Sequence, residues 1–356
     1  MKGLCILGRN KIGWKDLPKP EVGPNDALVK PTALCPCTSD VHIVETLPET
    51  YTKIVGKVFG HEGIGVVVEV GANVQRIKVG DRVAGFGMCL DWRSPEAQRG
   101  FAQLDPKTLY EDRMVQFGGT YQEFMYSYEA DANLSIIPDN VTDKQAVLIS
   151  DMMGTAFTQT EVANINYGDT VAVYGIGPVG LMSIAAAKLK GAARIIAIGS
   201  RPCGVELAKF YGATDIVNYK DGPVDEQIIK LTKGEKCESV LMSGPPGPAI
   251  NEVMNFTRPG GTISNVGIWW DEAETVISNA SWGFGCLNQF NITGTYVKSG
   301  RVWTDRLLNL VSYGRVDPGP LATQEYYGFE KIEEAYYRMS VKSDDMLKPV
   351  VYCNDL

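Results

Sequence analysis

A glycine-rich turn in the middle of the chain constrains the fold most strongly. The residues Gly175-Ile176-Gly177-Pro178-Val179-Gly180 follow the pattern G-x-G-x-x-G, between a buried-strand segment at 171–174 and a helix-like run at 181–192. The first glycine permits a tight turn, and the second lets the backbone approach a pyrophosphate at the positive N-terminus of the helix. The pattern predicts a dinucleotide-binding unit, and a plain strand–helix turn without a ligand remains the alternative.

The chain divides by texture into two parts. Residues 1–150 contain short β-branched runs interrupted by glycine and proline, such as ALVKPTAL and GIGVVVEVG, which are typical of an antiparallel, barrel-like β domain. From about residue 168 strands alternate with helices, which predicts βαβ units and a doubly wound parallel sheet. The pattern becomes mixed again after residue 295. We therefore expect a β-rich domain over 1–154 and 297–356, and an α/β domain over 155–296.

The end of the second expected strand, at 194–198, bears on the choice of cofactor. It is followed by Gly199-Ser200-Arg201, where a carboxylate would accept hydrogen bonds from the ribose 2′-hydroxyl of NAD. Here glycine leaves space, serine offers a hydroxyl, and arginine supplies a cation with a planar donor fork for a 2′-phosphate. The sequence favours NADP(H), the alternative being a solvated arginine after a strand.

The chain contains two histidines, His42 and His61, and both lie near a possible metal ligand. Cys37 and His42 belong to a Cys-x-Ser-x-x-His string, and His61 precedes Glu62. A thiolate, an imidazole and nearby carboxylates make a borderline-soft site that suits zinc and leaves room for an open position. Considered separately, a cysteine like Cys37 is more often a buried thiol than a ligand, and a histidine like His61 is more often a core residue.

A longer string favours the interpretation of Cys37 and His61 as metal ligands. Gly60-His61-Glu62-x-x-Gly65, then Gly71 and Val74, then Val79-Gly80-Asp81-Arg82-Val83 resembles the zinc-type medium-chain alcohol dehydrogenases. Together with the Cys-x-Ser-x-x-His string and the glycine-rich turn, the resemblance covers essentially the whole chain in the right order. It implies a GroES-like β-barrel catalytic domain and a Rossmann domain with a doubly wound parallel sheet.

Further strings resemble the NADP-dependent secondary alcohol dehydrogenases of anaerobic bacteria and protozoa. They include Pro36-Cys37-Thr38-Ser39-Asp40, Asp151-Met152-Met153, Gly199-Ser200-Arg201-Pro202, the run from Tyr211 to Pro223, and Lys348-Pro349-Val350-Val351. This branch implies a homotetramer that interconverts alcohols with ketones or aldehydes by hydride transfer.

The same resemblance implies one catalytic zinc per subunit. Its ligands would be Cys37, His61 and Asp151, with Glu62 as a fourth, exchangeable ligand; spacing alone does not select Asp151. Long-chain relatives carry a second, structural zinc on four clustered cysteines. The lobe between residues 85 and 116 contains only Cys89, so no such site is expected.

Ser39 and His42 match the family's proton relay, which runs through the cofactor ribose to solvent. An imidazole with a pKa near 6.5 suits the solvent end of such a relay. Asp40 is expected to accept a hydrogen bond from one of the metal ligands. The alternative for Ser39 is that it only caps a helix beginning near Asp40.

On the cofactor side the resemblance assigns residues to each part of NADP(H). The residues 176–179 of the turn would contact the pyrophosphate, and Gly199, Ser200, Arg201 and Tyr219 the 2′-phosphate. Lys342 would be a second cation for that phosphate. The remaining expected contacts are Val266, Gly267 and Ile268 near the nicotinamide half, with Thr38 and Thr155 also touching the cofactor.

Composition excludes several other classes. The net charge of −8 argues against general affinity for nucleic acid or anionic membranes. The N-terminal apolar run is too short for a signal peptide, no segment approaches the roughly 18 apolar residues of a membrane span, and the scattered cysteines indicate a reduced, cytoplasmic protein.

Two rival interpretations remain open: a zinc-free medium-chain quinone or enoyl reductase, and a non-catalytic NADPH-binding protein. The segments 85–90, 101–116, 268–271 and 282–300 depart from the family's strings. Because they shape the substrate cavity, the sequence supports the chemistry but does not specify the substrate.

Overall fold

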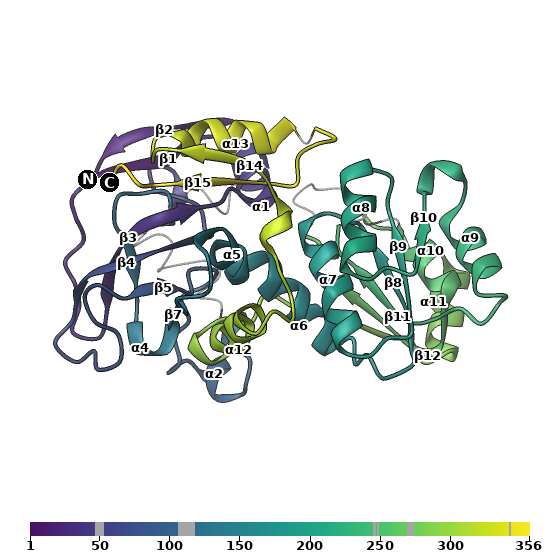
Figure 1. Ribbon diagram of the computed structural model, residues 1–356. Helices are drawn as coiled ribbons and strands as arrows, with labels where there is room; N and C mark the ends of the chain where they lie inside the picture. The colour runs from purple at the N-terminus through teal and green to yellow at the C-terminus, as the bar shows by residue number, and fades with distance from the viewer. Residues whose placement is uncertain (47–52, 106–117, 245–246, 248, 269–273, 342) are drawn as a thin grey trace. The chain divides into compact units, whose positions relative to one another are not determined.

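The computed structural model describes residues 1–46, 53–105, 118–244, 247, 249–268, 274–341 and 343–356. It divides into two compact units, the first formed by Met1–Gly154 and Val297–Leu356 and the second by Thr155–Tyr296. Both ends of the chain therefore belong to the first unit (Figure 1). None of the described helices is long and apolar enough to cross a membrane.

The first unit is built on a seven-stranded sheet, in the order β14-β15-β3-β4-β5-β7 with β6 paired to β3. Its neighbours run antiparallel except for β14 and β15, so the expected β-rich domain is confirmed. The strands are β3 (Ala27–Leu34), β4 (Gly63–Val70), β5 (Arg82–Ala84), β6 (Met125–Ser127), β7 (Ser135–Ile136), β14 (Ala322–Tyr327) and β15 (Lys348–Tyr352), and a separate antiparallel pair is formed by β1 (Lys2–Gly8) and β2 (Lys11–Asp16).

The central strand β3 carries Pro31, which has no N–H to donate to a neighbouring strand. The register between β3 and β4 shifts at this point, between Pro31 and Ala33. Beyond the shift, Leu34 pairs with Gly63 and also with Val351 of β15. The residues that follow β3 and precede β4 therefore emerge at the same edge of the sheet, next to the beginning of β15.

Apolar side chains from the strands, from helices and from connecting segments form the core of this unit. Leu4, Ile6, Val29, Leu34 and Tyr336 are among its buried members. The helical segments are α1 (Thr38–Thr46), α2 (Pro95–Gln98), η2 (Ala102–Leu104), α4 (Ala130–Asn133), α5 (Asp143–Val147), the π-helix η4 (Ile149–Met153), α12 (Arg301–Ser312), η6 (Gly319–Leu321) and α13 (Lys331–Val341).

The second unit is a six-stranded parallel sheet in the order β10-β9-β8-β11-β12-β13. This order places β8 beside β11 at the middle of the sheet, which is the doubly wound arrangement predicted for a Rossmann domain. Its strands are β8 (Thr170–Tyr174), β9 (Arg194–Ile198), β10 (Asp215–Val217), β11 (Cys237–Met242), β12 (Thr257–Asn265) and β13 (Asn291–Gly294).

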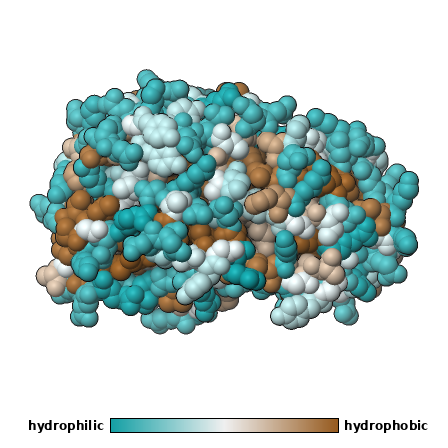
Figure 2. Space-filling view, in the orientation of Figure 1, coloured by the Kyte–Doolittle hydropathy of each residue, from teal (hydrophilic) through white to brown (hydrophobic). Residues whose placement is uncertain are grey.

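Helices connect these strands, as the alternating pattern predicts. They are α6 (Gly154–Val162, whose first residue belongs to the first unit), α7 (Pro178–Leu189), α8 (Pro202–Tyr211), η5 (Tyr219–Asp221), α9 (Val224–Leu231), α10 (Ala249–Phe256) and α11 (Asn279–Leu287). In the view of Figure 2 hydrophilic residues cover much of the surface, with hydrophobic residues showing between them.

Candidate metal centre and cofactor turn

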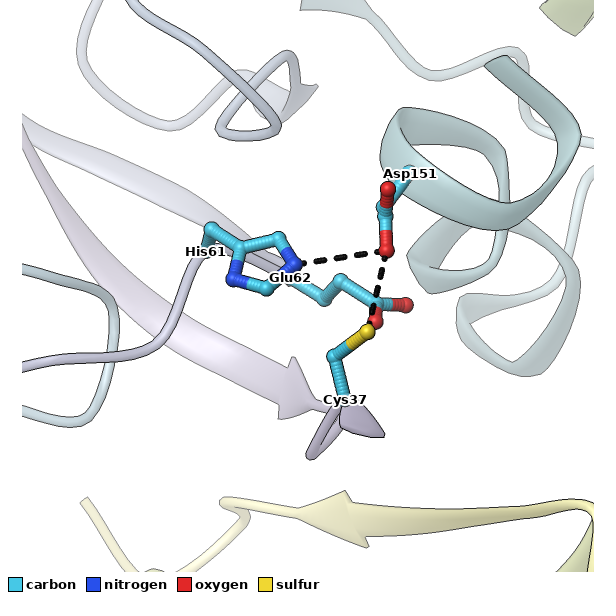
Figure 3. A group of neighbouring side chains, drawn as sticks. All are labelled: Cys37, His61, Glu62 and Asp151. Atoms are coloured by element: carbon cyan, nitrogen blue, oxygen red, sulfur yellow. Dashed lines mark hydrogen bonds and ion pairs between the residues drawn. The ribbon is translucent and has the colours of Figure 1, made fainter. Parts of the chain in front are cut away.

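Four side chains of the first unit converge on one point. Cys37 follows β3, His61 and Glu62 precede β4, and Asp151 lies in the π-helix η4. Each offers one possible ligand atom, and these atoms all lie within 4.8 Å of one another. Figure 3 shows the four side chains pointing toward one another. The pairing of Leu34 with Gly63 explains why the first three meet, since it aligns the two segments that carry them.

Asp151 links the thiol and the imidazole in the structure. Its Oδ2 lies 3.4 Å from Cys37 Sγ and 3.3 Å from His61 Nε2. A π-helix is rare and frequently occurs at functional sites. The wide turn at 149–153 is thus the local feature that carries Asp151 at this position.

Asp40 holds His61 from the opposite side. The Oδ1 of Asp40 lies 3.0 Å from His61 Nδ1, while its Oδ2 accepts hydrogen bonds from the Tyr121 hydroxyl and the backbone N–H of Cys37. A metal-binding histidine typically donates its other ring N–H to a carboxylate in this way. With Nδ1–H donated to Asp40, the lone pair of Nε2 is available on the side of the cluster.

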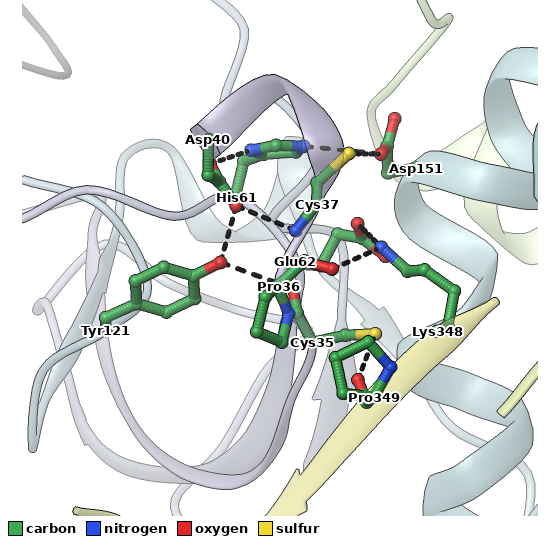
Figure 4. Close-up of polar contacts among 10 residues, drawn as sticks. All are labelled: Cys35, Pro36, Cys37, Asp40, His61, Glu62, Tyr121, Asp151, Lys348 and Pro349. Atoms are coloured by element: carbon green, nitrogen blue, oxygen red, sulfur yellow. Dashed lines mark hydrogen bonds and ion pairs between the residues drawn. The ribbon is translucent and has the colours of Figure 1, made fainter. Parts of the chain in front are cut away.

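Lys348 is a further member of the site that sequence reasoning did not select. It is fully buried at the start of β15, and its ammonium group contacts Glu62 Oε1 and donates to the carbonyl oxygen of Pro36, 2.8 Å away (Figure 4). Its string was recognised in the sequence, but only the pairing of β15 with β3 reveals its place. Tyr121 was missed because its contact with Asp40 joins residues that are far apart in the sequence.

Burial and mutual contacts shift the pKa values of the cluster. Burial raises the pKa of the Cys37 thiol, and it raises the pKa of Glu62 to about 8 against the opposing effect of Lys348. Burial also disfavours the charged form of Asp151, but the hydrogen bond and charge of His61 outweigh it and lower the pKa of that carboxyl. A bound metal ion reverses the shift of a coordinating thiol, because the thiol is then deprotonated.

The donor set fits zinc. Zinc in catalytic sites is bound by thiolate sulfur, imidazole nitrogen and carboxylate oxygen, with a position left for water or substrate. One atom gives a direct indication: Glu62 Oε2 is buried and has no hydrogen-bond partner among the described residues. Because buried polar atoms are almost always satisfied, this oxygen has room for a cation.

The glycine-rich turn of the second unit joins β8 to α7, as predicted. Gly175 has a positive φ of 100°, which favours glycine. At Gly180 a Cβ would lie 1.8 Å from the carbonyl oxygen of Gly175, so only glycine allows α7 to start this close to the strand. Gly177 has no such contact: the nearest atom to its missing Cβ is Nη2 of Arg201, at 3.9 Å. The open face of the turn thus faces a guanidinium.

The residues after β9 fit a phosphate-bearing ribose. At Gly199 a Cβ would lie 2.2 Å from Ile176 Cγ1, which keeps the position free of a side chain. Ser200 donates a hydrogen bond of 2.7 Å to the Tyr219 hydroxyl, and Arg201 directly precedes α8. Two hydroxyls and one guanidinium therefore stand where an NAD-specific domain carries its acid.

Gln159 supports the neighbouring strand ends from within the second unit. Its buried amide donates to the carbonyl oxygens of Met242 and Ser264, at the ends of β11 and β12, and accepts from the hydroxyls of Ser183 and Ser243. Val266 and Gly267 directly follow β12, and Ile268 is exposed.

The other predicted residues are less closely grouped. Thr38, Ser39 and His42 lie on α1, and His42 is half-buried with Nδ1 3.7 Å from Glu45 Oε2. The helix begins at Thr38, so Ser39 lies inside its first turn and not before it, and its interpretation as a cap is wrong. Thr155 lies in the first turn of α6. Lys342 and most of the divergent segments 101–116 and 268–271 lie outside the described residues.

The β-rich unit, the Rossmann unit and the candidate metal-binding cluster are the features of a zinc-dependent dehydrogenase. The chain belongs to the zinc-binding alcohol dehydrogenase family. The alcohol dehydrogenase GroES-like domain matches residues 23–139, and the zinc-binding dehydrogenase domain matches residues 178–312. Comparison with individual relatives gives a more specific match within this family. The chain is 44% identical to the NADP-dependent isopropanol dehydrogenase of Thermoanaerobacter brockii, over 99% of both chains.

Two further relatives carry the same name. The protein from Clostridium beijerinckii is 43% identical over 99% of both chains, and that from Entamoeba histolytica is 41% identical over 99% of this chain and 95% of its own. Among solved structures, alcohol dehydrogenase TADH from Thermus sp. ATN1 shares the fold with a TM-score of 0.87 at 24% identity, covering 99% of this chain and 100% of that one.

Proposed function

We propose that this chain is a zinc- and NADP(H)-dependent dehydrogenase that interconverts secondary alcohols and ketones. The observation that carries the proposal is the convergence of Cys37, His61, Glu62 and Asp151 within 4.8 Å. It occurs in a chain whose relatives at 41% to 44% identity, matched over almost their full length, are named NADP-dependent isopropanol dehydrogenases.

Cys37, His61 and Asp151 would hold the zinc, with Glu62 as an exchangeable fourth ligand. When bound, zinc supplies a Lewis acid that polarises the substrate oxygen and eases loss of the alcohol's proton. The protein's contribution is to orient the ligands: Asp40 keeps the proton of His61 on Nδ1, and Tyr121 and the Cys37 backbone hold Asp40 in place.

The proton of the alcohol needs a route to solvent, which we assign to Ser39 and His42. Both lie on α1, directly after Cys37, and His42 is partly exposed. A hydroxyl near the reacting oxygen can pass a proton on, and an imidazole titrates in the range where exchange with water is fast.

NADP(H) would bind to the second unit. The backbone of the turn from Gly175 to Gly180 would receive the pyrophosphate, while Ser200, Arg201 and Tyr219 would surround the 2′-phosphate. At Gly199 the Ile176 side chain fills the space that a Cβ would take, so the residue would contribute backbone alone beside that phosphate. The further expected contacts are Val266, Gly267 and Ile268 for the nicotinamide half, and Thr38, Thr155 and Lys342 elsewhere on the cofactor.

The deciding experiment combines metal analysis with an activity screen. We expect one zinc per chain, NADPH-dependent reduction of ketones of graded size, and far lower efficiency with NADH. Removing zinc with a chelator should abolish reduction, and adding zinc should restore it. Reduction of quinones or enones that persists in zinc-free protein would support a zinc-free reductase, and NADPH binding without any turnover would support a binding protein.

We also propose that the chain forms a homotetramer in a reduced, cytoplasmic compartment. Strand β13 is at the edge of its sheet, and the nearby helix α11 exposes Trp282, Phe284 and Leu287, which suits contact with another copy. None of the eight cysteines, all of which the structure describes, forms a disulfide. Light scattering should give four times the mass of the chain, and a monomer would contradict the assembly.

A further inference from the structure

The lysine buried beside the four candidate metal ligands is not explained by packing alone. Lys348 has no exposed surface, and its Nζ contacts Glu62 Oε1 and the carbonyl oxygen of Pro36, the residue before Cys37 (Figure 4). Burying an ammonium group is costly unless it is paired. A lysine at this position therefore indicates that positive charge is needed here.

The lysine is not required to fix its own strand. Val351 and Tyr352 of β15 pair with β3, and the whole of β15 pairs with β14. The Cys35 thiol also donates to the carbonyl oxygen of Pro349, 2.9 Å away. Since main-chain pairing and this contact already anchor β15, the charge of Lys348 is available for another role.

The two oxygens of Glu62 differ in their surroundings. Oε1 is paired with Lys348, whereas Oε2 is buried without a hydrogen-bond partner among the described residues. A carboxylate held through one oxygen keeps the other free for a cation. The lysine contact can therefore persist whether or not the second oxygen binds a metal.

The charges of the cluster support a balancing role. The thiolate of Cys37 and the carboxylates of Glu62 and Asp151 carry one negative charge more than a zinc ion neutralises. Lys348 supplies that missing positive charge at Glu62 itself. Without it, a Glu62 carboxylate that leaves the metal would stand alone in a buried, poorly solvated place, which is strongly unfavourable.

We propose that Lys348 is a positioning residue that makes Glu62 an exchangeable rather than a permanent metal ligand. By holding Oε1 in both states, it stabilises the carboxylate when Oε2 is off the metal and so lets another ligand take the open position. This inference rests on the proposed zinc chemistry and concerns how readily one ligand leaves.

The test uses the full chain with Co²⁺ in place of zinc, because cobalt's visible absorption reports ligand exchange. The variant is Lys348→Met, which keeps the side chain's length and removes its charge. Imidazole serves as the probe for the open position. We expect Lys348→Met to require about 10-fold more imidazole than the wild type, and to release zinc to a chelator about 10-fold more slowly. Lys348→Arg should restore the wild-type titration.

A matched pair of variants keeps the test decisive if Lys348→Met folds poorly. Glu62→Gln and the neutral double variant Lys348→Met/Glu62→Gln should bind imidazole equally, within about twofold, because the lysine acts through Glu62. A larger difference within this pair overturns the proposal, as does a folded Lys348→Met that titrates like the wild type or fails to retain metal. Absence of any metal in the wild-type protein would instead refute the zinc chemistry on which the inference rests.

Discussion

The two candidate sites of this molecule are built in opposite ways. The cofactor turn is made by contiguous residues of one strand–turn–helix unit, and its shape depends on the absence of side chains at Gly175 and Gly180. The candidate metal site is made by side chains from segments as distant as Cys37 and Asp151, with the buried Lys348 beside Glu62. A site made of backbone is specified locally, whereas a site made of side chains depends on the packing of its whole unit.

This difference implies that the two sites should fail independently. The largest effect is expected for His61→Ala, which removes one of the four candidate metal ligands. We expect the zinc content to fall to near zero and ketone reduction to fall by about 10³-fold or more, because the Lewis acid is lost. The NADPH dissociation constant, measured by cofactor fluorescence, should stay within about twofold of the wild type.

The outcome that would break the comparison is a parallel loss of NADPH affinity in a folded His61→Ala protein. Retention of zinc would show instead that His61 is not a ligand. Circular dichroism provides the control for folding.

His42→Ala should have a smaller effect, since His42 is near the surface and water can replace it. We expect turnover to fall by at most about 10²-fold, with zinc content and NADPH affinity unchanged. The loss should shrink when a small exogenous base is added, and grow toward lower pH in alcohol oxidation. Glu45→Gln, which alters the neighbour of His42 on the same helix, is the matched control. Loss of zinc in His42→Ala would make His42 a ligand.

Arg201→Ala addresses the other site. It should raise the KM for NADPH by about tenfold and leave kcat nearly unchanged, because it removes a phosphate contact remote from the reacting carbon. The KM for NADH should change little. Arg258→Ala, which removes a surface arginine paired with Glu238 in the same unit, serves as the control. Equal efficiency of the wild type with NADH and NADPH would contradict the assignment.

The smallest expected effect concerns an ion pair in the second unit that involves neither site. The hydrogen bond from Arg194 lowers the pKa of Asp215, against the opposing effect of partial burial. A depressed carboxyl pKa stabilises the fold above the unfolded-state value near 3.9, and this stability is lost as pH falls through the folded pKa.

Asp215→Asn should therefore lower the free energy of unfolding at pH 7 by roughly 1 kcal/mol, measured by urea denaturation, and the gap to the wild type should narrow as the pH falls below about 4. Zinc content should not change at either pH. A gap that persists unchanged at pH 3 would show that the pair's charge is not responsible.

The fold and the cofactor turn were largely predictable from the sequence, for physical reasons. Alternating strands and helices define a parallel sheet, and a turn that admits no side chain must be written with glycine, as at Gly175 and Gly180. The thiol and imidazole of the candidate metal site could also be predicted, because Cys37 and His61 flank two strands that pair.

The other residues of the candidate metal site could not be predicted from local sequence patterns. Asp151 was expected only through family resemblance, since its direction depends on a π-helix that leaves no clear signature in the sequence. Lys348 and Tyr121 act through partners more than eighty positions away, Glu62 and Asp40 respectively. Such contacts are determined by strand register and burial, which a single sequence does not reveal.

The division of the first unit between the two ends of the chain has a consequence for synthesis on the ribosome. All four candidate ligands have emerged by residue 151, but Lys348 and the strand that carries it come last. At ordinary translation speeds the intervening residues take roughly 10–40 s to add. If Lys348 has the proposed role, a zinc ion bound during that interval meets Glu62 without its cation, and it should exchange less readily then than after β15 has paired with β3.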